Sequence, residues 1–295
     1  MALLFALLIT GCLFSFSVYV VVKDIFANPI LSRTNVNQRP VATAGGLVFI
    51  VALVPIWLVI AWHERSGYQI LSGEYLQAVF LATGTVGLFG VLGLIDDLLA
   101  SGTERGFRGH LGALRRGQLS TGALKLVAGS MGALALAALW SSGSWWRILL
   151  SGAVVALAAN LANLFDRAPA RVTKVSTLLT VAAVAISLVF SAGSLPEPHA
   201  AWGAAALVLG MSWGLLVPEL SEKVMLGDTG ANPLGATIGL TAVLVAPAAI
   251  ELGLLVVLLG LNLVSERVSF SKIIAKNKLL NSFDMWGRNS GAPFS

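Results

Sequence analysis

The sequence predicts an all-α membrane protein: a polytopic bundle of about nine transmembrane helices. Of its 295 residues, 57% are hydrophobic and only 11% are charged, with a mean hydropathy of +0.85. A soluble domain carries roughly 25% charged residues. Apolar stretches of membrane-spanning length also recur from one end of the chain to the other, and no polar block between them is long enough to form a soluble domain.

Runs of about 17–25 apolar residues suffice to cross a bilayer as a helix. We expect spans near residues 2–22, 44–62, 75–95, 121–140, 146–164, 175–192, 200–217, 233–249 and 251–264. The first run has no basic segment before it and no small-residue cleavage site at Lys23-Asp24, so we expect a retained helix rather than a signal peptide.

The distribution of basic residues predicts the orientation. With the N-terminus outside, only Arg65 and Arg147 of the 19 Lys and Arg residues fall on the outer side. This bias predicts an N-out, C-in protein. The basic residues are spread over membrane-proximal loops, which indicates topology signals rather than a nucleic-acid surface. A single cysteine, Cys12, excludes disulfides and cysteine-rich metal sites.

The chain therefore divides into a transmembrane bundle, residues 1–264, and a cytoplasmic amphipathic tail, residues 265–295. In the tail, apolar residues at helical spacing alternate with Lys272, Lys276 and Lys278. This pattern predicts a helix lying at the inner membrane interface, although an ordinary surface helix has the same pattern.

Every aspartate falls on the cytoplasmic side of this topology, and Asp96 and Asp97 end the third span together. Two adjacent anions at the edge of a bilayer are costly unless a cation holds them. They could ligate a hard cation such as Mg²⁺, or one of them could act as a general base. The alternative is solvated charge that merely ends the span.

Two further motifs lie at the same membrane face. Asn160 and Asn163 share a helix face that leads to Asp166, and Arg171 follows within reach of a phosphate; an ordinary helix end with basic residues would look similar. Asp228 lies between Gly227 and Gly230 at the start of a span. It could hold a metal while the helix N-terminus favours phosphate oxygens, or it could simply cap the helix.

Two basic residues complete the candidate site. Lys125 lies one turn into the fourth span, where a lysine needs an acidic partner, and Asp96 and Asp97 are adjacent in topology. Arg39, before the Gly45-Gly46 pair, could reach an anionic head group. Carboxylates, a lysine and arginines at one face suit Mg²⁺-assisted chemistry between a lipid phosphate and a soluble phosphorylated donor.

The order of these motifs resembles the polyprenyl-phosphate N-acetylhexosamine-1-phosphate transferases, which include phospho-N-acetylmuramoyl-pentapeptide transferase and the GlcNAc-1-phosphate transferases of cell-envelope and peptidoglycan synthesis. The resemblance spans roughly residues 30–240. The matching segments are Arg39 with Gly45-Gly46, Gly93-Leu94-Ile95-Asp96-Asp97, Lys125, Asn160 to Asp166, and Met225-Leu226-Gly227-Asp228-Thr229-Gly230.

The resemblance implies Mg²⁺-dependent transfer of a sugar-1-phosphate from a UDP-sugar to undecaprenyl phosphate at the cytoplasmic face of the plasma membrane, with release of UMP. The resemblance also allows Mn²⁺ in place of Mg²⁺, and it allows a homodimer. By motif, Asp228 would be the principal Mg²⁺ ligand, and Lys125 would bind phosphate. Asp96 and Asp97 would serve the acceptor phosphate or its deprotonation. Asn163 and Asp166 would line the donor pocket.

Two departures indicate a divergent branch with an altered donor pocket. The family usually has a histidine-rich motif in its last large cytoplasmic loop, whereas residues 265–288 contain no histidine. Asp166 is followed by Arg167-Ala168-Pro169-Ala170, where the family usually has glycines and a second aspartate. A non-catalytic relative that binds a lipid-linked precursor or an envelope-assembly partner is therefore the alternative. An ion-coupled carrier would place its carboxylates near the bilayer midplane rather than at helix ends.

Overall fold

The structure is a computed structural model that describes residues 1–34, 40–67, 72–99, 121–140, 144–190 and 195–288. The chain is nearly all helical, which confirms the predicted helical class. Six described helical segments are long and apolar enough to cross a membrane. These segments are Ala2–Ala27, Leu47–Ser66, Gly73–Leu99, Trp145–Phe165, Arg171–Phe190 and Ala248–Ser265. The larger count of nine spans and the orientation remain predictions.

The helix bounds follow the apolar runs closely. The long helices are α1 (Ala2–Val22), α2 (Leu47–Ser66), α3 (Gly73–Thr85), α4 (Val91–Leu99), α6 (Thr121–Trp140), α7 (Trp145–Phe165), α8 (Arg171–Phe190), α9 (His199–Gly214), α11 (Gly227–Val245) and α12 (Ala248–Ser265). Shorter elements are the 3₁₀ turns η1 (Lys23–Ala27) and η2 (Pro29–Leu31), the π-helical η3 (Val86–Gly90), and helices α10 (Leu216–Leu220), α13 (Phe270–Lys276) and α14 (Lys278–Met285).

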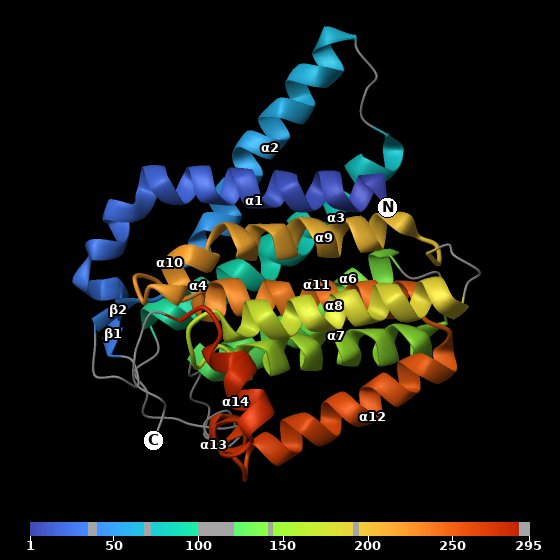
Figure 1. Ribbon diagram of the computed structural model, residues 1–295. Helices are drawn as coiled ribbons and strands as arrows, with labels where there is room; N and C mark the ends of the chain where they lie inside the picture. The colour runs from blue at the N-terminus through green and yellow to red at the C-terminus, as the bar shows by residue number, and fades with distance from the viewer. Residues whose placement is uncertain (35–39, 68–71, 100–120, 141–143, 191–194, 289–295) are drawn as a thin grey trace.

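Helix α9 lies inside the bundle, with α1 against one side and α11 against another (Figure 1). Nearly all of its residues are buried, which is typical of a helix that is apolar on every face. Small residues allow the close approach of α1: a Cβ on Gly11 would lie 2.9 Å from the Met211 nitrogen, and the Ser15 hydroxyl donates to the Met211 carbonyl at 2.8 Å.

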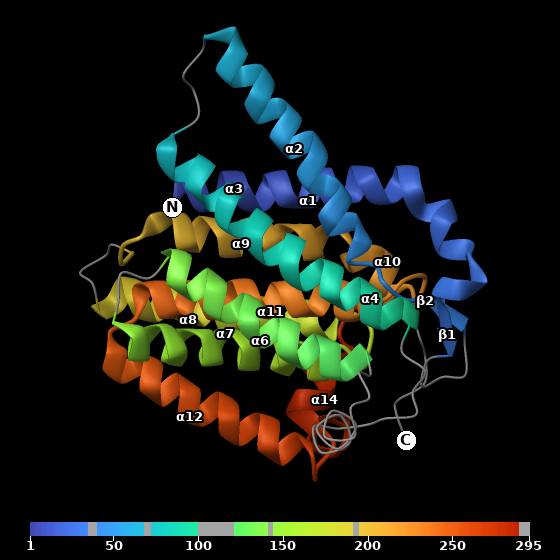
Figure 2. The same ribbon diagram turned by 180° about the vertical axis from the view of Figure 1, so that it is seen from behind.

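Helix α11 packs on α7 through a second small-residue seam. A Cβ on Gly235 would lie 2.6 Å from Ala162 Cβ, and one on Gly239 would lie 2.8 Å from Ala158 Cβ. The outermost helix of this side, α12, packs on α7 (Figures 1 and 2). The fully buried Glu251 of α12 accepts a hydrogen bond from the Ser151 hydroxyl of α7. Arg147 Nε lies 3.5 Å from the other carboxylate oxygen of Glu251, so this buried charge is paired.

A pair of short strands differs from the predicted all-helical fold. Residues Ser32–Thr34 (β1) and Pro40–Ala42 (β2) form an antiparallel pair, and Ala42 also pairs with Val224 in a parallel bridge. The amide of Gly45 donates to the Met225 carbonyl at 2.8 Å. The β1–β2 pair is local to the segment before α2, whereas the bridge to Val224 and the Gly45–Met225 bond join that segment to the one before α11, a contact that local propensity does not predict.

The third predicted span also differs from a regular helix. It runs unbroken from Gly73 to Leu99, but the π-helical η3 interrupts the α-helical hydrogen bonding between α3 and α4. Such π-segments are frequent near functional sites. The predicted tail helix is two short helices, α13 and α14, which lie at the end of the bundle where α4, β1 and β2 also lie (Figure 1).

Candidate functional site

The carboxylate of Asp97, in α4, holds the first turn of α11. Its Oδ1 accepts from the Asp228 amide at 3.1 Å, and its Oδ2 accepts from the Thr229 amide at 2.9 Å and the Thr229 hydroxyl at 2.6 Å. The first amides of a helix have no partner within the helix, and a side chain just before it usually supplies one. Here an acid from 131 positions away in the sequence supplies it.

Glycines permit this close approach. Gly227 has a φ of +66°, and a Cβ there would lie 2.5 Å from Asp97 Oδ2 and 2.7 Å from the Ala44 nitrogen. Gly93, one turn before Asp97, lies directly against α11, where a Cβ would lie 2.6 Å from the Thr229 nitrogen. The two predicted acidic motifs are therefore in direct contact.

Lys125 of α6 brings a cation to the same junction. Its ammonium is hydrogen-bonded to the Asp228 carboxylate and lies 3.9 Å from Asp96 Oδ2. The side chains of Lys125, Asp96 and Asp228 are 17–20% exposed, so these charged groups are mostly buried but remain accessible to solvent. One ammonium thus lies between two carboxylates that belong to different helices.

Two more carboxylates lie behind this junction. Asp166, the residue that ends α7, is 7% exposed, and Glu219 in α10 is 1% exposed. Burial raises the pKa of Asp166 well above its usual range, and the carboxylates of Glu219, Asp97 and Asp228 raise it further. Burial also raises the pKa of Glu219 to about 8. A raised pKa favours the neutral, protonated form of each carboxyl group, so Asp166 and Glu219 hold a proton more readily than free carboxyl groups do.

The sequence analysis did not identify Glu219. Its hydrogen bonds are long, 3.3 Å from the Thr173 hydroxyl and 3.4 Å from the Leu226 amide. The available signal was a single acid inside the otherwise apolar run Leu215–Leu220, and such an acid in a membrane protein is usually functional or paired.

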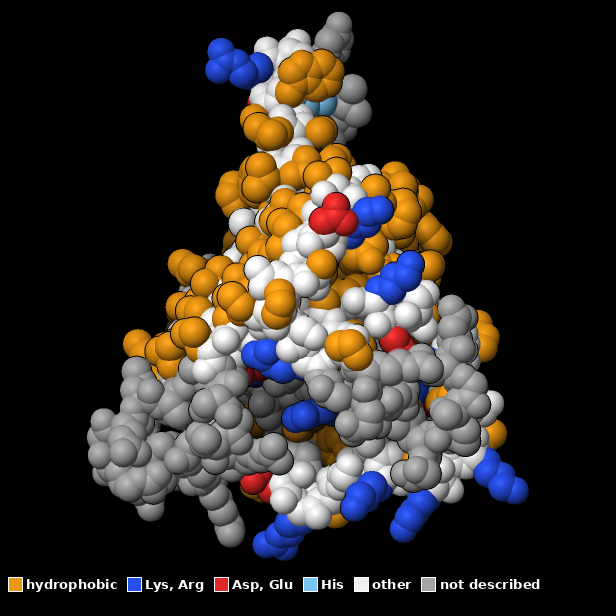
Figure 3. Space-filling view, turned by 90° about the vertical axis from the view of Figure 1, so that its left-hand side faces the viewer, with side chains coloured by type: hydrophobic (Ala, Val, Ile, Leu, Met, Phe, Trp, Pro, Cys, Tyr) orange, Lys and Arg blue, Asp and Glu red, His pale blue; other side chains and the backbone are white. Residues whose placement is uncertain are grey.

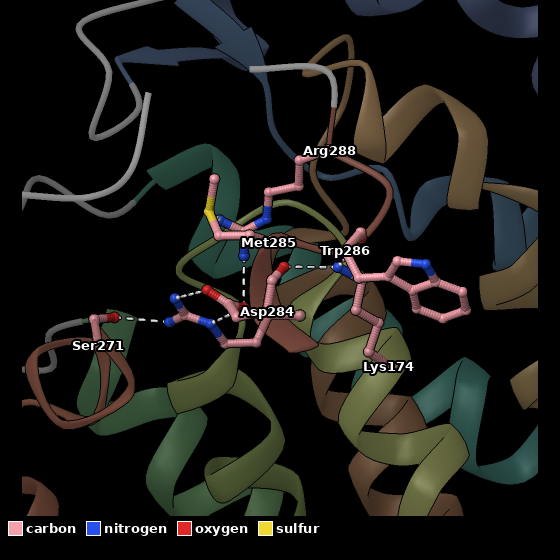
Figure 4. Close-up of polar contacts among 7 residues, drawn as sticks. Lys174, Ser271, Asp284, Met285, Trp286 and Arg288 are labelled. Atoms are coloured by element: carbon pink, nitrogen blue, oxygen red, sulfur yellow. Dashed lines mark hydrogen bonds and ion pairs between the residues drawn. The ribbon is translucent and has the colours of Figure 1, made fainter. Parts of the chain in front are cut away.

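Arg171 hydrogen-bonds to Ser271 and Asp284 of the tail rather than to the acidic junction. Figure 4 shows Asp284 in this network, together with Lys174 and Arg288. The Arg171 guanidinium donates two 2.8 Å hydrogen bonds to the Asp284 carboxylate, and Arg288 Nη2 lies 2.5 Å from the same group. Lys174 donates to the main-chain carbonyls of Asp284 and Trp286 at 2.7 and 2.6 Å. Burial alone would raise the pKa of Asp284, but the arginines hold it below its usual value.

The remaining predicted residues fall in three places. The Asn160 amide donates to Asn262 of α12 at 2.6 Å and so contributes to helix packing. Asn163 is half-buried one turn before Asp166. Arg39 lies outside the described residues. Arg33 of β1, which precedes it in the sequence, donates to the main-chain carbonyl of Asp97 at 2.9 Å. The donor-pocket roles of these residues stay predictions.

The face of the molecule that carries the tail and strands has Lys and Arg side chains around a hollow (Figure 3). At the other end, His199 Nδ1 lies 3.3 Å from both Glu74 and Glu197. The carboxylates of that second group are exposed, at 51% and 74%, whereas those of Asp96 and Asp228 at the junction are 20% and 17% exposed. No protein-family model matches the chain, and no curated protein matches it either.

Proposed function

We propose that the protein is a Mg²⁺-dependent phosphoglycosyl transferase of the cytoplasmic face of the plasma membrane. It moves a sugar-1-phosphate from a UDP-sugar to undecaprenyl phosphate or a related polyprenyl phosphate, in cell-envelope glycan synthesis. An oxygen of the acceptor phosphate attacks the phosphorus that carries the sugar. The bond from that phosphorus to the bridging oxygen breaks, and UMP leaves with that oxygen.

One observation carries this proposal: Asp96, Asp97, Asp228 and Lys125, distant in sequence, meet at one junction. The resemblance to the transferase family assigns its metal and phosphate machinery to these same positions. A carrier would instead need its carboxylates along a path through the bilayer, and these residues lie at the ends of α4 and α11 and one turn into α6.

The donor set fits a hard cation. The junction offers carboxylate oxygens and no thiolate or imidazole among the described residues, which is the ligand chemistry that Mg²⁺ prefers. The buried Asp166 Oδ1 has no hydrogen-bond partner among the described residues, so the site has unused acceptor capacity. Asp228 would hold the metal, which would supply positive charge to offset the charge of the phosphates during transfer.

The side chains then divide the work as follows. Lys125 binds a phosphate oxygen and offsets the charge of Asp228. Asp96, which is partly exposed, orients the acceptor phosphate and takes its proton when that phosphate arrives protonated. Asp97 is committed to the α11 amides, so its role in this proposal is to position Asp228 rather than to react.

A donor-panel assay tests the proposal. Purified protein, Mg²⁺ and undecaprenyl phosphate are incubated with UDP-GlcNAc, UDP-GalNAc and UDP-MurNAc-pentapeptide, and UMP is measured. We expect UMP from at least one donor, and at least a 100-fold lower rate with Asp228→Asn or Lys125→Gln. Glu64→Gln, far from the junction in sequence and on the predicted outer side, is the matched charge control and should retain the wild-type rate.

Equal rates for wild type and Asp228→Asn would refute the transferase. Saturable binding of undecaprenyl phosphate without turnover of any donor would favour the alternative, a non-catalytic relative that binds a lipid-linked precursor. The orientation is tested separately in a Cys12→Ala background. A membrane-impermeant thiol reagent added outside intact cells should label Glu197→Cys and should not label Leu279→Cys.

A further inference from the structure

Asn232, in the second turn of α11, is a buried amide whose polar atoms are unsatisfied within the described part of the chain. It is 2% exposed, and neither its Nδ2 nor its Oδ1 has a hydrogen-bond partner among the described residues. A buried amide costs free energy unless its donor and its acceptor are both satisfied. Neither the sequence motifs nor the family resemblance assigned a role to this residue.

The chain contains a contrasting amide that serves packing. Asn262 of α12 accepts from Asn160 Nδ2 at 2.6 Å, and its own Nδ2 donates to the carbonyls of Leu258 and Leu157 at 2.8 and 3.2 Å. That is the usual fate of a polar side chain between membrane helices. Asn232 makes no such bond to any residue that the structure describes, so interhelical hydrogen bonding among them does not account for it.

The position of Asn232 points it toward the acidic junction. It follows Asp228 by four residues and precedes Gly235 by three, so the three share one face of α11. That face packs on α7, since Gly235 lies against Ala159 and Ala162. Helical side chains lean toward the N-terminus of their helix, which directs Asn232 toward the turn of Asp228.

Asp166 lies in the same seam. It follows Ala162 by one turn at the end of α7, and α7 and α11 run in opposite directions (Figures 1 and 2). Ala162 of α7 lies against Gly235 of α11. One turn further along α7 is Asp166, and about one turn back along α11 is Asn232, so these two residues lie at the same level. The buried Asp166 Oδ1 is also without a hydrogen-bond partner among the described residues. Three unsatisfied polar atoms thus lie in one seam next to Asp228.

We propose that Asn232 and Asp166 form the outer shell of the cation site, where they bind water molecules of a hydrated Mg²⁺ held by Asp228. The inference rests on the proposed function, because it assumes a cation at Asp228. Mg²⁺ usually keeps several of its waters, and each of these needs acceptors. Asn232 Oδ1 and Asp166 Oδ1 supply acceptors, while Asn232 Nδ2 donates to an oxygen of the same shell.

The experiment uses the full chain in detergent with Mn²⁺ as the probe, and it has two readouts: Mn²⁺ affinity by electron paramagnetic resonance, and the metal-free melting temperature. Asn232→Leu removes both polar atoms at similar volume. We expect it to weaken Mn²⁺ binding at least tenfold, as loss of an outer-shell group does. Its metal-free melting temperature should equal or exceed that of the wild type, because an unsatisfied buried amide is gone.

Asn262→Leu is the matched control: we expect a lower melting temperature and unchanged Mn²⁺ affinity. A lower melting temperature for Asn232→Leu, or Mn²⁺ affinity within twofold of the wild type, would overturn the inference. If Asn232→Leu does not fold, Asn232→Ala, which is smaller than the residue it replaces, gives the same comparison. Asp228→Asn distinguishes failure of the inference from failure of the proposed function. If Asp228→Asn binds Mn²⁺ as the wild type does, both are overturned. If Asp228→Asn loses Mn²⁺ binding but Asn232→Leu keeps it, only the inference is overturned.

Discussion

Asp97 and Thr229 are joined by two hydrogen bonds to one carboxylate oxygen, at 2.9 Å from the Thr229 amide and 2.6 Å from its hydroxyl. This contact fixes α4 to the first turn of α11, and with it the position of Asp228. The rigidity of the proposed metal site therefore depends on a residue that need not touch a substrate.

Thr229→Val tests this contact by removing the hydroxyl at nearly constant shape. Loss of one hydrogen bond to a charged group should cost about 1.5–3 kcal/mol of stability. The turnover number should fall more than the apparent donor affinity, because Asp228 is held less firmly. Thermal unfolding and steady-state kinetics are the measurements. Thr229→Ser keeps the hydroxyl and should restore the wild-type values; a serine variant as impaired as the valine variant would contradict this role.

Gly227→Ala should damage the junction sterically. The new Cβ would lie 2.5 Å from Asp97 Oδ2, in addition to the strain of a φ of +66°. Gly67→Ala is a matched control, since Gly67 has a φ of +73° and nothing within 4 Å of an added Cβ. The control should cost about 1 kcal/mol, and Gly227→Ala should cost clearly more and abolish Mn²⁺ binding. Equal thermal destabilisation of the two variants would show that the Asp97 side chain moves away from the new Cβ at no cost in stability, which would contradict this prediction.

We expect the contribution of Glu219 to the stability of the folded protein to fall as the pH rises. Its pKa is raised from 4.5 to about 8 in the folded protein, so the folded state binds the proton more tightly than the unfolded state. The resulting stabilisation is complete below pH 4.5 and is lost as the pH rises through about 8. Asp166, whose pKa is also raised, acts with the same sign.

Melting temperatures between pH 5 and pH 9 measure this effect. The wild type should lose stability across that range, and Glu219→Gln should show a smaller loss because its side chain is neutral throughout. A wild type that is more stable at pH 9 than at pH 5 would contradict the burial of these acids. Asp284, whose pKa is lowered, loses its ion-pair stabilisation only as the pH falls through its folded-state pKa, which lies outside this window.

Arg171 should hold the tail to the bundle. Arg171→Ala removes the two-pronged bond to the buried Asp284 and should cost about 3 kcal/mol. Arg171→Lys keeps the charge but not the planar fork, so it should recover only part of this loss. Hydrogen exchange of α13 and α14 is the measurement, with faster exchange expected in both variants. Lys278→Gln, an exposed change on the same tail, should leave exchange as in the wild type.

The sequence by itself determined the helical membrane class and most helix limits. Long apolar runs can satisfy their backbone in lipid only as helices, so composition predicted a last span at residues 251–264, whereas the structure begins this helix earlier, at Ala248, directly after Pro247. The same reasoning placed Asp96, Asp97, Asp166 and Asp228 at helix ends, because charges end apolar runs.

Only the tertiary structure decided which of these side chains meet. Asp97 caps α11, Asn160 bonds to Asn262, and Arg171 is neutralised by Asp284; the residue types alone allowed other pairings for all three. The physical reason is that helices such as α9 are apolar on every side, so no polar stripe in the sequence records which face turns toward which neighbour. Rotation and crossing are set by glycine seams such as Gly93 against α11, and those contacts bring Lys125 and Asp228 together.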